Sequence, residues 1–222
     1  MKEIIKKIVT IAVVMTAIVL PCNGAKVAKD TLTSRDVFLN LPLKTLDILD
    51  RSEKMDMLDY YDADSIYNAP NGMEGLSHLI KVTPDFLSVQ LTKVTSMQIL
   101  ILPPGKGPAA MTLYTIDSDG EAADTEVSFF DSYFNELERK KYLQYPDILD
   151  FFNIPDKDVR NKIEDLVPFP TIEFQVVPGS TDLRAVLTVG EYMGKEDYDF
   201  IKKYMKESLL YRYDGKSYRL VK

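Results

Sequence analysis

The stretch FLSVQLT at residues 86–92 decides how this chain folds, because apolar and polar side chains alternate along it. Leu87, Val89 and Leu91 point one way, a period of two that is typical of a strand with one buried face. The stretch MQILIL at residues 97–102 is apolar on both faces, as in a strand covered from both sides. We therefore predict an antiparallel hairpin near the middle of a sheet, with one half-exposed and one buried strand.

The N-terminus has the three parts of an export signal. Three lysines lie within the first seven residues, and residues 8–20 form an apolar run that is too short to span a bilayer comfortably. A proline and small residues then precede a cleavage point after Gly24. We expect residues 1–24 to be a signal peptide and the rest to be periplasmic or extracellular. Acylation of Cys22, giving an outer-membrane lipoprotein, is the alternative that fits less well.

The composition excludes several classes of protein. The net charge of −7 would repel DNA or RNA, and removing residues 1–24 with three lysines and one glutamate makes it more negative. The one cysteine, Cys22, lies in the expected signal peptide, so neither a disulfide scaffold nor a thiol enzyme is expected. An apolar content of 45% over 222 residues is enough for a core without such cross-links.

Further strands are predicted on both sides of the central hairpin. Their expected ranges are 77–82, 111–116, 125–130, 172–176, 183–189, 209–213 and 216–221. Asp214-Gly215 is the strongest two-residue turn signal between neighbouring strands. Because most strands that follow each other along the chain look like hairpins, the sheet is predicted to be mainly antiparallel.

Helices are predicted at the N-terminus, in the middle and near the C-terminus. Their expected ranges are 33–41, 43–51, 53–61, 146–152, 155–166 and 196–207. Leu43, Leu46 and Leu49 place an apolar stripe on the second of these, and the last carries acids in its first turn and lysines near its end. Helices and sheet together define an α+β domain over residues 25–222.

One echo in the pattern points to internal duplication. Residues 88–91 lead through a turn into an apolar strand, and residues 173–176 do the same, each after a helical stretch. A duplicated helix-plus-hairpin unit would divide the domain into two similar lobes, about 33–131 and 146–222. Two unrelated amphipathic hairpins would give the same pattern, so both interpretations stay open.

Five short motifs carry a resemblance to a known family. They are KMDMLDYY at 54–61, LSHL at 76–79, TPDFLS at 83–88, EYM at 191–193 and LYRY at 210–213. From about Thr33 onward the chain resembles a Bacteroidales-restricted family of exported proteins of unknown function. The resemblance implies an envelope or secreted protein and no particular activity, because none of the motifs is tied to a chemistry.

The segment 115–126 is the best candidate for a metal site. Set against a calcium-binding loop, Asp117, Asp119 and Glu126 fall at the third, fifth and twelfth positions. The first position is Thr115, which offers no carboxylate, and strands flank the loop. A hairpin turn with solvated acids explains the same residues, so calcium is the weaker interpretation, and no other cofactor is expected.

Asp56 and Asp59 stand three residues apart on one predicted helix, with Tyr60 beside them. Paired carboxylates carry out glycoside hydrolysis, and Glu164 or Asp165 would supply a second acid from a distant segment. An acid-rich solvated surface is the plainer explanation of the first pair.

His78 is the only histidine, so a zinc site with two imidazoles is excluded, and we expect a partly exposed strand residue. Tyr211 and Tyr213 belong to a concentration of tyrosines near the C-terminus, a residue type that suits interfaces. Cross-strand packing of either one with Tyr218 is the simpler explanation.

No residue is assigned a catalytic role from the sequence. We expect an exported, non-catalytic protein that binds another protein or an envelope component, with weak binding candidates at Asp56, Asp59, Tyr60, Tyr211 and Tyr213. The alternative is a hydrolase that uses carboxylates alone on glycans or peptides. A carrier of lipids or small ligands is a third hypothesis, which needs a large apolar cavity. Neither a nucleic-acid partner nor a transmembrane segment beyond the signal is expected.

Overall fold

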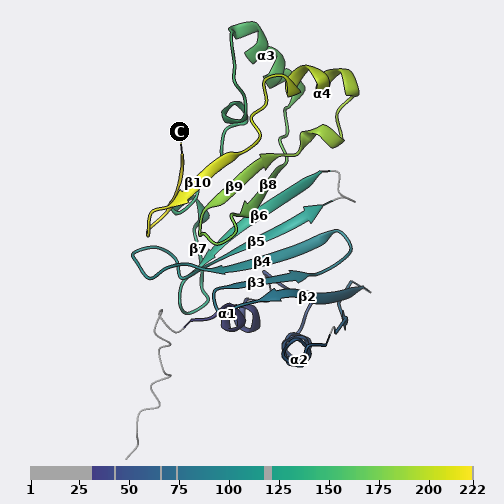
Figure 1. Ribbon diagram of the computed structural model, residues 1–222, viewed down its shortest axis with the longest axis vertical. Coiled ribbons are helices and arrows are strands. Elements are labelled where there is room, and N and C mark those ends of the chain that lie inside the picture. The colour runs from purple at the N-terminus through teal and green to yellow at the C-terminus, as the bar shows by residue number, and fades with distance from the viewer. Residues whose placement is uncertain (1–31, 43, 66, 74, 118–121, 222) are drawn as a thin grey trace, which may run out of the picture.

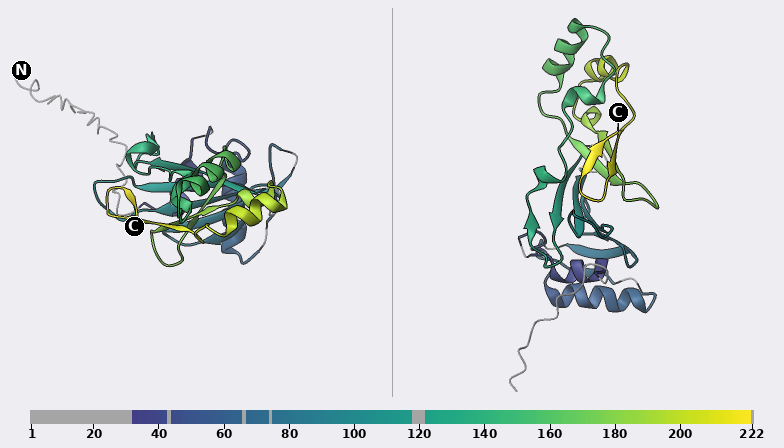
Figure 2. Two further views of the ribbon diagram at one scale, coloured as in Figure 1. Left: turned by 90° about the horizontal axis from the view of Figure 1, so that it is seen from above. Right: turned by 90° about the vertical axis from the view of Figure 1, so that its left-hand side faces the viewer.

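Two antiparallel sheets form the centre of the molecule, and helices lie at both ends of its long axis (Figures 1 and 2). The computed structural model describes residues 32–42, 44–65, 67–73, 75–117 and 122–221. The first sheet has seven strands that follow one another in chain order, and the second has four strands in the order β11-β10-β9-β8. This confirms the predicted α+β class with mainly antiparallel sheet.

The elements have the following bounds. The first sheet consists of β1 (Ala69–Pro70), β2 (Leu76–Val82), β3 (Phe86–Gln90), β4 (Thr95–Ile101), β5 (Ala110–Asp117), β6 (Ala123–Phe130) and β7 (Glu136–Leu137). The second consists of β8 (Ile172–Val176), β9 (Leu183–Leu187), β10 (Leu209–Tyr213) and β11 (Tyr218–Leu220). The helices are α1 (Ser34–Asn40), α2 (Arg51–Asp62), α3 (Lys157–Leu166) and α4 (Lys195–Lys202), with short 3-10 turns η2 (Arg139–Lys141), η3 (Ile148–Phe151) and η4 (Val189–Glu191).

The predicted central hairpin is formed by β3 and β4, the third and fourth of the seven strands. Leu87 pairs with Ile99 and Val89 with Met97, and all four side chains are fully buried. Ser88 lies between these buried positions on the opposite face and stays half-buried. The period of two therefore fixes which face of β3 is buried, as its sequence predicts.

The prediction that β4 is covered on both faces was only partly right. Ser96 and Gln98 stay half-buried on the face opposite Met97 and Ile99, and only Leu100 is buried there. Gln98 interrupts the apolar run, so most of that face of β4 has no cover.

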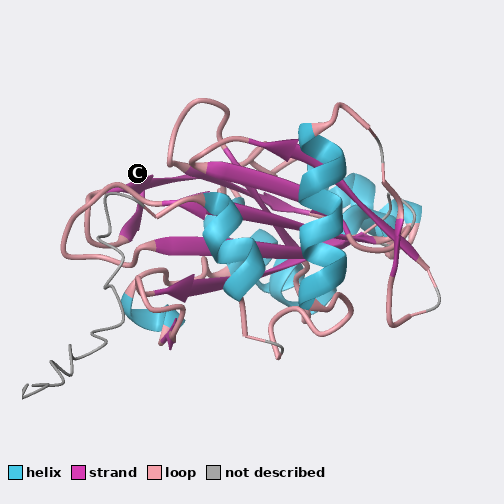
Figure 3. Cartoon of the chain, turned by 90° about the horizontal axis from the view of Figure 1, so that it is seen from below, coloured by secondary structure: helices cyan, strands magenta, loops and turns pink. Residues whose placement is uncertain are grey.

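The seven-stranded sheet is covered on both faces, but over different strands. On one face, here called the helix face, α1 and α2 pack across β1–β4 (Figure 3). Val37 and Phe38 of α1 join Leu87, Val89 and Ile99 in that core.

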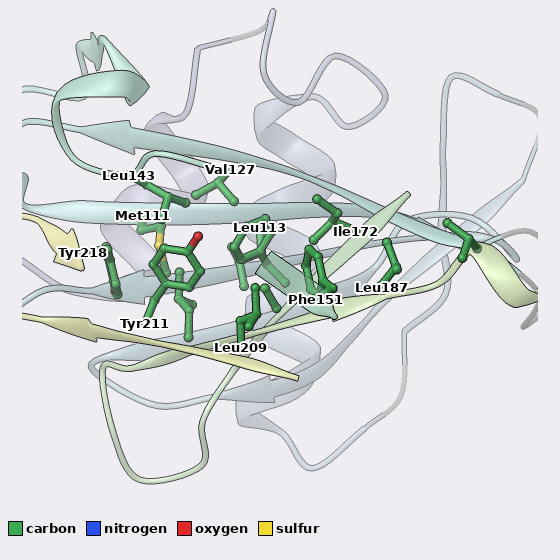
Figure 4. Packing of buried hydrophobic residues seen from close by; sticks show 14 of the residues in the cluster. Met111, Leu113, Val127, Leu143, Phe151, Ile172, Leu187, Leu209, Tyr211 and Tyr218 are labelled. Carbon is green, nitrogen blue, oxygen red and sulfur yellow. The ribbon is translucent and has the colours of Figure 1, made fainter. Parts of the chain in front are cut away.

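On the opposite face, here called the sheet face, the four-stranded sheet lies over β5 and β6. Met111, Leu113 and Val127 point from the first sheet toward Leu209 and Tyr211 of the second (Figure 4).

Strand β5 is where the two covered regions meet. Ala110 and Thr112 are buried on its helix face, and Met111 and Leu113 are buried on its sheet face. On either side of β5 one face is left without a cover.

The first uncovered region, the β2–β4 polar area, lies on the sheet face and consists of Lys81, Ser88, Gln90, Ser96 and Gln98. The second, the β5–β6 acidic area, lies on the helix face and consists of Tyr114, Glu126 and Ser128.

Both N-terminal helices begin at capping boxes. Thr33 caps α1 together with Asp36, as the sequence predicts. α2 begins at Arg51, because the Asp50 side chain accepts from the Glu53 N–H while the Glu53 carboxylate accepts from the Asp50 N–H. This arrangement needs extended backbone at Asp50, which prevents a helix from running through it. The predicted helix over 43–51 was therefore wrong, and the described residues 44–50 form turns.

Two other predicted helices are shorter than expected. Residues 146–152 contain only the 3-10 turn η3, and the last helix ends at Lys202 instead of near residue 207. The Asn153 N–H donates to the carbonyl of Tyr204, and the Lys206 N–H donates to the carbonyl of Phe151. The backbone beyond α4 thus pairs with the segment around η3, which explains why the helix does not continue.

The duplication of a helix-plus-hairpin unit is not confirmed. Residues 33–131 contribute strands of a seven-stranded sheet, whereas residues 146–222 contribute a four-stranded one. Apolar residues of both ranges pack together in one core cluster between the sheets. Among the described residues, the helices are all too short or too polar to cross a membrane.

Candidate functional site

The strongest candidate site is a groove between the two sheets, beside the β2–β4 polar area. Its cavity volume is ≈ 540 Å³, within the range of about 300–1,000 Å³ that is usual for ligand pockets. It is lined by Lys81, Thr83, Asp85, Phe86, Gln98, Leu100, Ile101, Val176, Pro178, Gly179, Ser180 and Thr181. We call it the inter-sheet groove.

One wall of the inter-sheet groove is built from two neighbouring rows of side chains. Strand pairing places Lys81, Ser88 and Gln98 side by side on three strands, which makes a polar row. Phe86 pairs with Leu100 two residues away along the strands, which makes an apolar row. Rows separated by two strand residues are about 7 Å apart. The wall therefore offers polar and apolar contacts at a fixed separation.

The polar row ends in a positive charge. Lys81 is exposed, and its Nζ lies 5.8 Å from the centre of the Phe86 ring. None of the ion pairs between described residues includes Lys81. Asp85, the acid at the mouth of the groove, accepts a hydrogen bond of 2.8 Å from the Thr83 hydroxyl. The groove thus combines an apolar row with a cation that has no carboxylate partner in the described chain.

The opposite wall is the turn between β8 and β9, which is fixed by several hydrogen bonds. The Val177 N–H donates to Asp182 O at 2.9 Å, and Gly179 adopts a positive φ of 72°, which favours glycine. The Tyr218 hydroxyl donates to the carbonyl of Thr181 at 2.8 Å. The terminal hairpin therefore holds this wall in place.

A second, smaller hollow of ≈ 340 Å³ lies in the β5–β6 acidic area. Asp47, Glu126 and Glu136 line it beside Tyr114 and Lys44. Lys44 Nζ lies 2.5 Å from a Glu136 carboxylate oxygen and holds the pKa of that carboxyl below its usual value. Burial raises the pKa of the Tyr114 phenol, and the charge of Asp47 adds to this. The cation here is already neutralised, so the hollow stays acidic.

None of the helical candidates lines either hollow. Asp56, Asp59 and Tyr60 are exposed on α2, where Tyr60 stacks on Tyr67 with ring centres 4.6 Å apart. Glu164 and Asp165 belong to α3, at the opposite end of the long axis (Figure 2). The structure does not bring these two pairs of carboxylates together.

The three residues of the candidate calcium loop are also not assembled into one site. Asp117 pairs with Ala123 across β5 and β6, whereas Glu126 pairs with Tyr114, so the two acids point to opposite faces. Asp119 lies outside the described residues. Within the described chain, no group of three or more His, Cys, Asp or Glu side chains is arranged to hold a metal ion.

The tyrosine candidates belong to the core between the sheets. Tyr211 is 3% exposed, and its ring centre lies 6.0 Å from that of Phe174. Burial raises the pKa of the Tyr211 phenol. Tyr213 is half-buried and packs 5.1 Å from its cross-strand partner Tyr218, and burial raises its pKa to about 12. The packing explanation fits this geometry. His78 is half-buried on β2, opposite Gln90.

The inter-sheet groove was not predicted from the sequence. Lys81 and Gln98 could have been found as polar residues on the unburied side of the central strands. Nothing in the sequence placed Val176 and Pro178 opposite them, because these residues come from the other sheet.

A family model described as a protein of unknown function, DUF3256, matches residues 27–218. The chain belongs to the DUF3256 family. Its fold is similar to a solved domain of an uncharacterized protein from Porphyromonas gingivalis W83, with a TM-score of 0.72 and 18% sequence identity. That likeness covers 84% of this chain and 96% of that one, and at this identity it shows the fold alone. Comparison with curated proteins found no match.

The family and the structural neighbour support the coarser part of the resemblance found in the sequence. The family is one of unknown function, and the neighbour comes from a Bacteroidales organism. Export of this DUF3256 chain and restriction of the family to Bacteroidales stay predictions.

Proposed function

We propose that this DUF3256 protein is exported and works as a non-catalytic binding protein of the cell envelope, with the inter-sheet groove as its binding surface. The observation that supports this most is the pairing of an apolar row with Lys81 in one preformed hollow. Ligand sites are mostly apolar concave surfaces with a few polar groups that fix orientation. Phe86, Leu100 and Val176 supply the first feature, and Lys81 and Gln98 supply the second.

Binding is favoured over hydrolysis by the arrangement of the acids. A carboxylate hydrolase needs two acids on either side of the bond that it cleaves, about 5–9.5 Å apart. Asp85 is the one carboxylate among the residues that line the inter-sheet groove, and it already accepts from Thr83. The carrier hypothesis is less favoured, because Lys81, Asp85 and Gln98 interrupt the apolar lining of the groove.

The proposed location rests on the signal-like N-terminus. Mass spectrometry of the protein from cell fractions should find a mature chain that begins at Ala25 in the periplasm or the medium. An acylated Cys22 at the N-terminus would contradict this cleavage, and an intact Met1 in the cytoplasm would contradict export itself.

The binding role can be tested by photo-cross-linking in the envelope of the native organism. A photoreactive residue in place of Gln98 should cross-link one discrete species, because Gln98 lines the inter-sheet groove. The matched control is the same substitution at Glu126, which lies on the opposite face of the same sheet. The species should disappear when Lys81→Glu is added. Absence of any species specific to position 98 would overturn the proposed binding surface.

A further inference from the structure

We propose that the inter-sheet groove binds the C-terminal end of an extended polypeptide whose last residue is apolar. The free carboxylate of that residue lies at Lys81 and Gln98, and its side chain lies on Phe86 and Leu100. This inference rests on the proposed function and names the class of ligand that the same surface takes.

The spacing of the two rows supports this ligand. Along the backbone the Lys81–Ser88–Gln98 row and the Phe86–Leu100 row are two strand residues apart, about 7 Å, and the Lys81 Nζ lies 5.8 Å from the centre of the Phe86 ring. In a terminal residue the carboxylate and the far end of a large apolar side chain are separated by a similar distance, since both branch from one Cα. Val176 and Pro178 face the apolar row from the other sheet, so the side chain is covered on two sides.

The charged side chains of the groove favour a ligand that has a single negative group, at the end of the groove where Lys81 lies. The chain carries a net charge of −7, yet at this groove Lys81 has no carboxylate partner among the described residues. A charged hydrogen bond from its ammonium to a carboxylate is stronger than a neutral one. Asp85 at the mouth of the groove repels a second negative group. A monoanion with an apolar body therefore fits better than a diacid or a neutral amide.

The surroundings favour a polypeptide over a small free acid. The β2–β4 polar area continues from the groove through Ser88, Gln90 and Ser96, all half-buried and on the same face. The two serine hydroxyls offer donors and acceptors for the amides of residues that precede the last one. Gln90 offers its amide oxygen, since its Nε2 already donates to backbone carbonyls at the β3–β4 turn. A small acid would use the groove and leave this area without a role.

The test is calorimetric titration of the purified chain with acetyl-Gly-Gly-Phe in two forms. The form with a free carboxylate should bind, and the form with a C-terminal amide should bind about 10-fold to 100-fold more weakly, the range for losing a hydrogen bond to a charged group. Lys81→Gln should weaken binding of the carboxylate form by the same factor. Lys93→Gln is the matched control and should leave binding unchanged, because Lys93 is an exposed lysine in the turn between β3 and β4 and does not line the groove.

A second variant tests the other polar contact of the carboxylate. Gln98→Glu places a negative charge in the polar row and should abolish binding, while the thermal unfolding curve shows that the protein remains folded. Equal affinity for the carboxylate and amide forms would overturn the inference. Equal affinity for 3-phenylpropionate and the peptide would also overturn it, because the polypeptide would then add nothing. If these peptides fail while the cross-link at position 98 persists, the terminal-carboxylate inference is wrong and the binding role stands.

Discussion

The two halves of the seven-stranded sheet are built alike and covered on opposite faces. In β2–β4 the helix face is buried under α1 and α2, whereas in β5–β6 the sheet face is buried under the second sheet. The uncovered surfaces differ in chemistry. One places Lys81 beside an apolar row, and the other places Lys44 against Glu136 among further acids. The comparison shows how one alternating pattern yields two surfaces, of which only the first keeps a cation without a carboxylate partner in the described chain.

Strand β5, which lies between these two halves, explains how one half can be covered on the helix face and the other on the sheet face. Along β5 both faces are buried from Ala110 to Leu113, and the strand becomes exposed only toward Ile116. A strand that is apolar on both faces can pack against a cover on either side. The helices α1 and α2 cover one face of the seven-stranded sheet, and the second sheet covers the opposite face farther along. Each uncovered area therefore lies next to the edge of one of these packed layers, where a groove can form.

The largest expected effect comes from removing a ring under the second sheet. Phe129 is fully buried, with its ring centre 5.5 Å from that of Tyr142 and 6.0 Å from that of Tyr218. Phe129→Ala should lower the free energy of unfolding by about 4 kcal/mol, because it removes apolar area and leaves a cavity. Gln98→Ala on the uncovered part of the same face should change it by less than about 0.5 kcal/mol. Urea denaturation followed by circular dichroism measures both.

Similar losses in both variants would contradict this comparison, because the β2–β4 polar area would then be packed as tightly as the core. A changed slope with urea in Phe129→Ala would indicate that the two sheets separate before the first sheet unfolds.

The next effect concerns one of the hydrogen bonds that join the two sheets. Thr125 is buried on β6, and its Oγ1 accepts from the Phe174 N–H of β8 at 3.1 Å. Thr125→Val keeps the shape and leaves that N–H without its partner, so the free energy of unfolding should fall by about 1–3 kcal/mol. The control is Thr115→Val, which removes only the 2.9 Å contact between the Thr115 and Thr125 hydroxyls. Equal effects of the two variants would show that the link between sheets does not depend on Thr125.

Most strands and the buried face of the central hairpin could be predicted from the sequence, because alternation is a local signal. Leu87 and Val89 lie on the buried face as predicted, and the turn at Asp214-Gly215 has the positive φ of 85° at Gly215 that its composition predicts. The error at 43–51 came from a competing local signal, the capping box at Asp50, which starts α2 at a position that the leucine spacing had assigned to the preceding helix.

The candidate site could not be predicted, because its two walls come from different sheets. The relation between Lys81 and Pro178 depends on how those sheets pack, which no local pattern encodes. The calcium proposal was limited in the same way, since only the register of β5 and β6 shows that Asp117 and Glu126 point to opposite faces.

A smaller, stabilising effect is expected under the helices. Lys54 of α2 is 2% exposed, its Nζ lies 5.8 Å from the Phe38 ring centre, and none of the ion pairs between described residues includes it. Burial lowers its pKa below the usual 10.5. Lys54→Met keeps the long side chain, removes the buried charge and should raise the free energy of unfolding at pH 7 by about 1 kcal/mol.

The pH dependence separates this cause from a change in packing. Between the lowered pKa in the folded state and the normal pKa in the unfolded state, the unfolded chain binds more protons, so stability rises with pH. The wild-type protein should therefore gain stability relative to Lys54→Met as the pH is raised from 8 toward 10.5. A stability difference that is independent of pH over this range would rule out the buried charge as the cause.

An effect of similar size to that of Lys54→Met distinguishes two neighbouring tyrosines. The Tyr218 hydroxyl donates to Thr181 in the wall of the inter-sheet groove, whereas the Tyr213 hydroxyl is buried without a hydrogen-bond partner among the described residues. Tyr218→Phe should lower the free energy of unfolding by about 1 kcal/mol, and Tyr213→Phe should leave it within about 0.5 kcal/mol.

The same pair tests whether the groove depends on its second wall. Loss of the Tyr218 bond releases the Thr181 carbonyl and with it the turn that faces Phe86 and Leu100, so peptide affinity should fall in Tyr218→Phe and stay unchanged in Tyr213→Phe. If both variants bind the peptide as the wild type does, the ligand is held by the β2–β4 polar area alone. The affinity for the peptide would then come from the uncovered face of the first sheet, and the turn between β8 and β9 would contribute nothing to it.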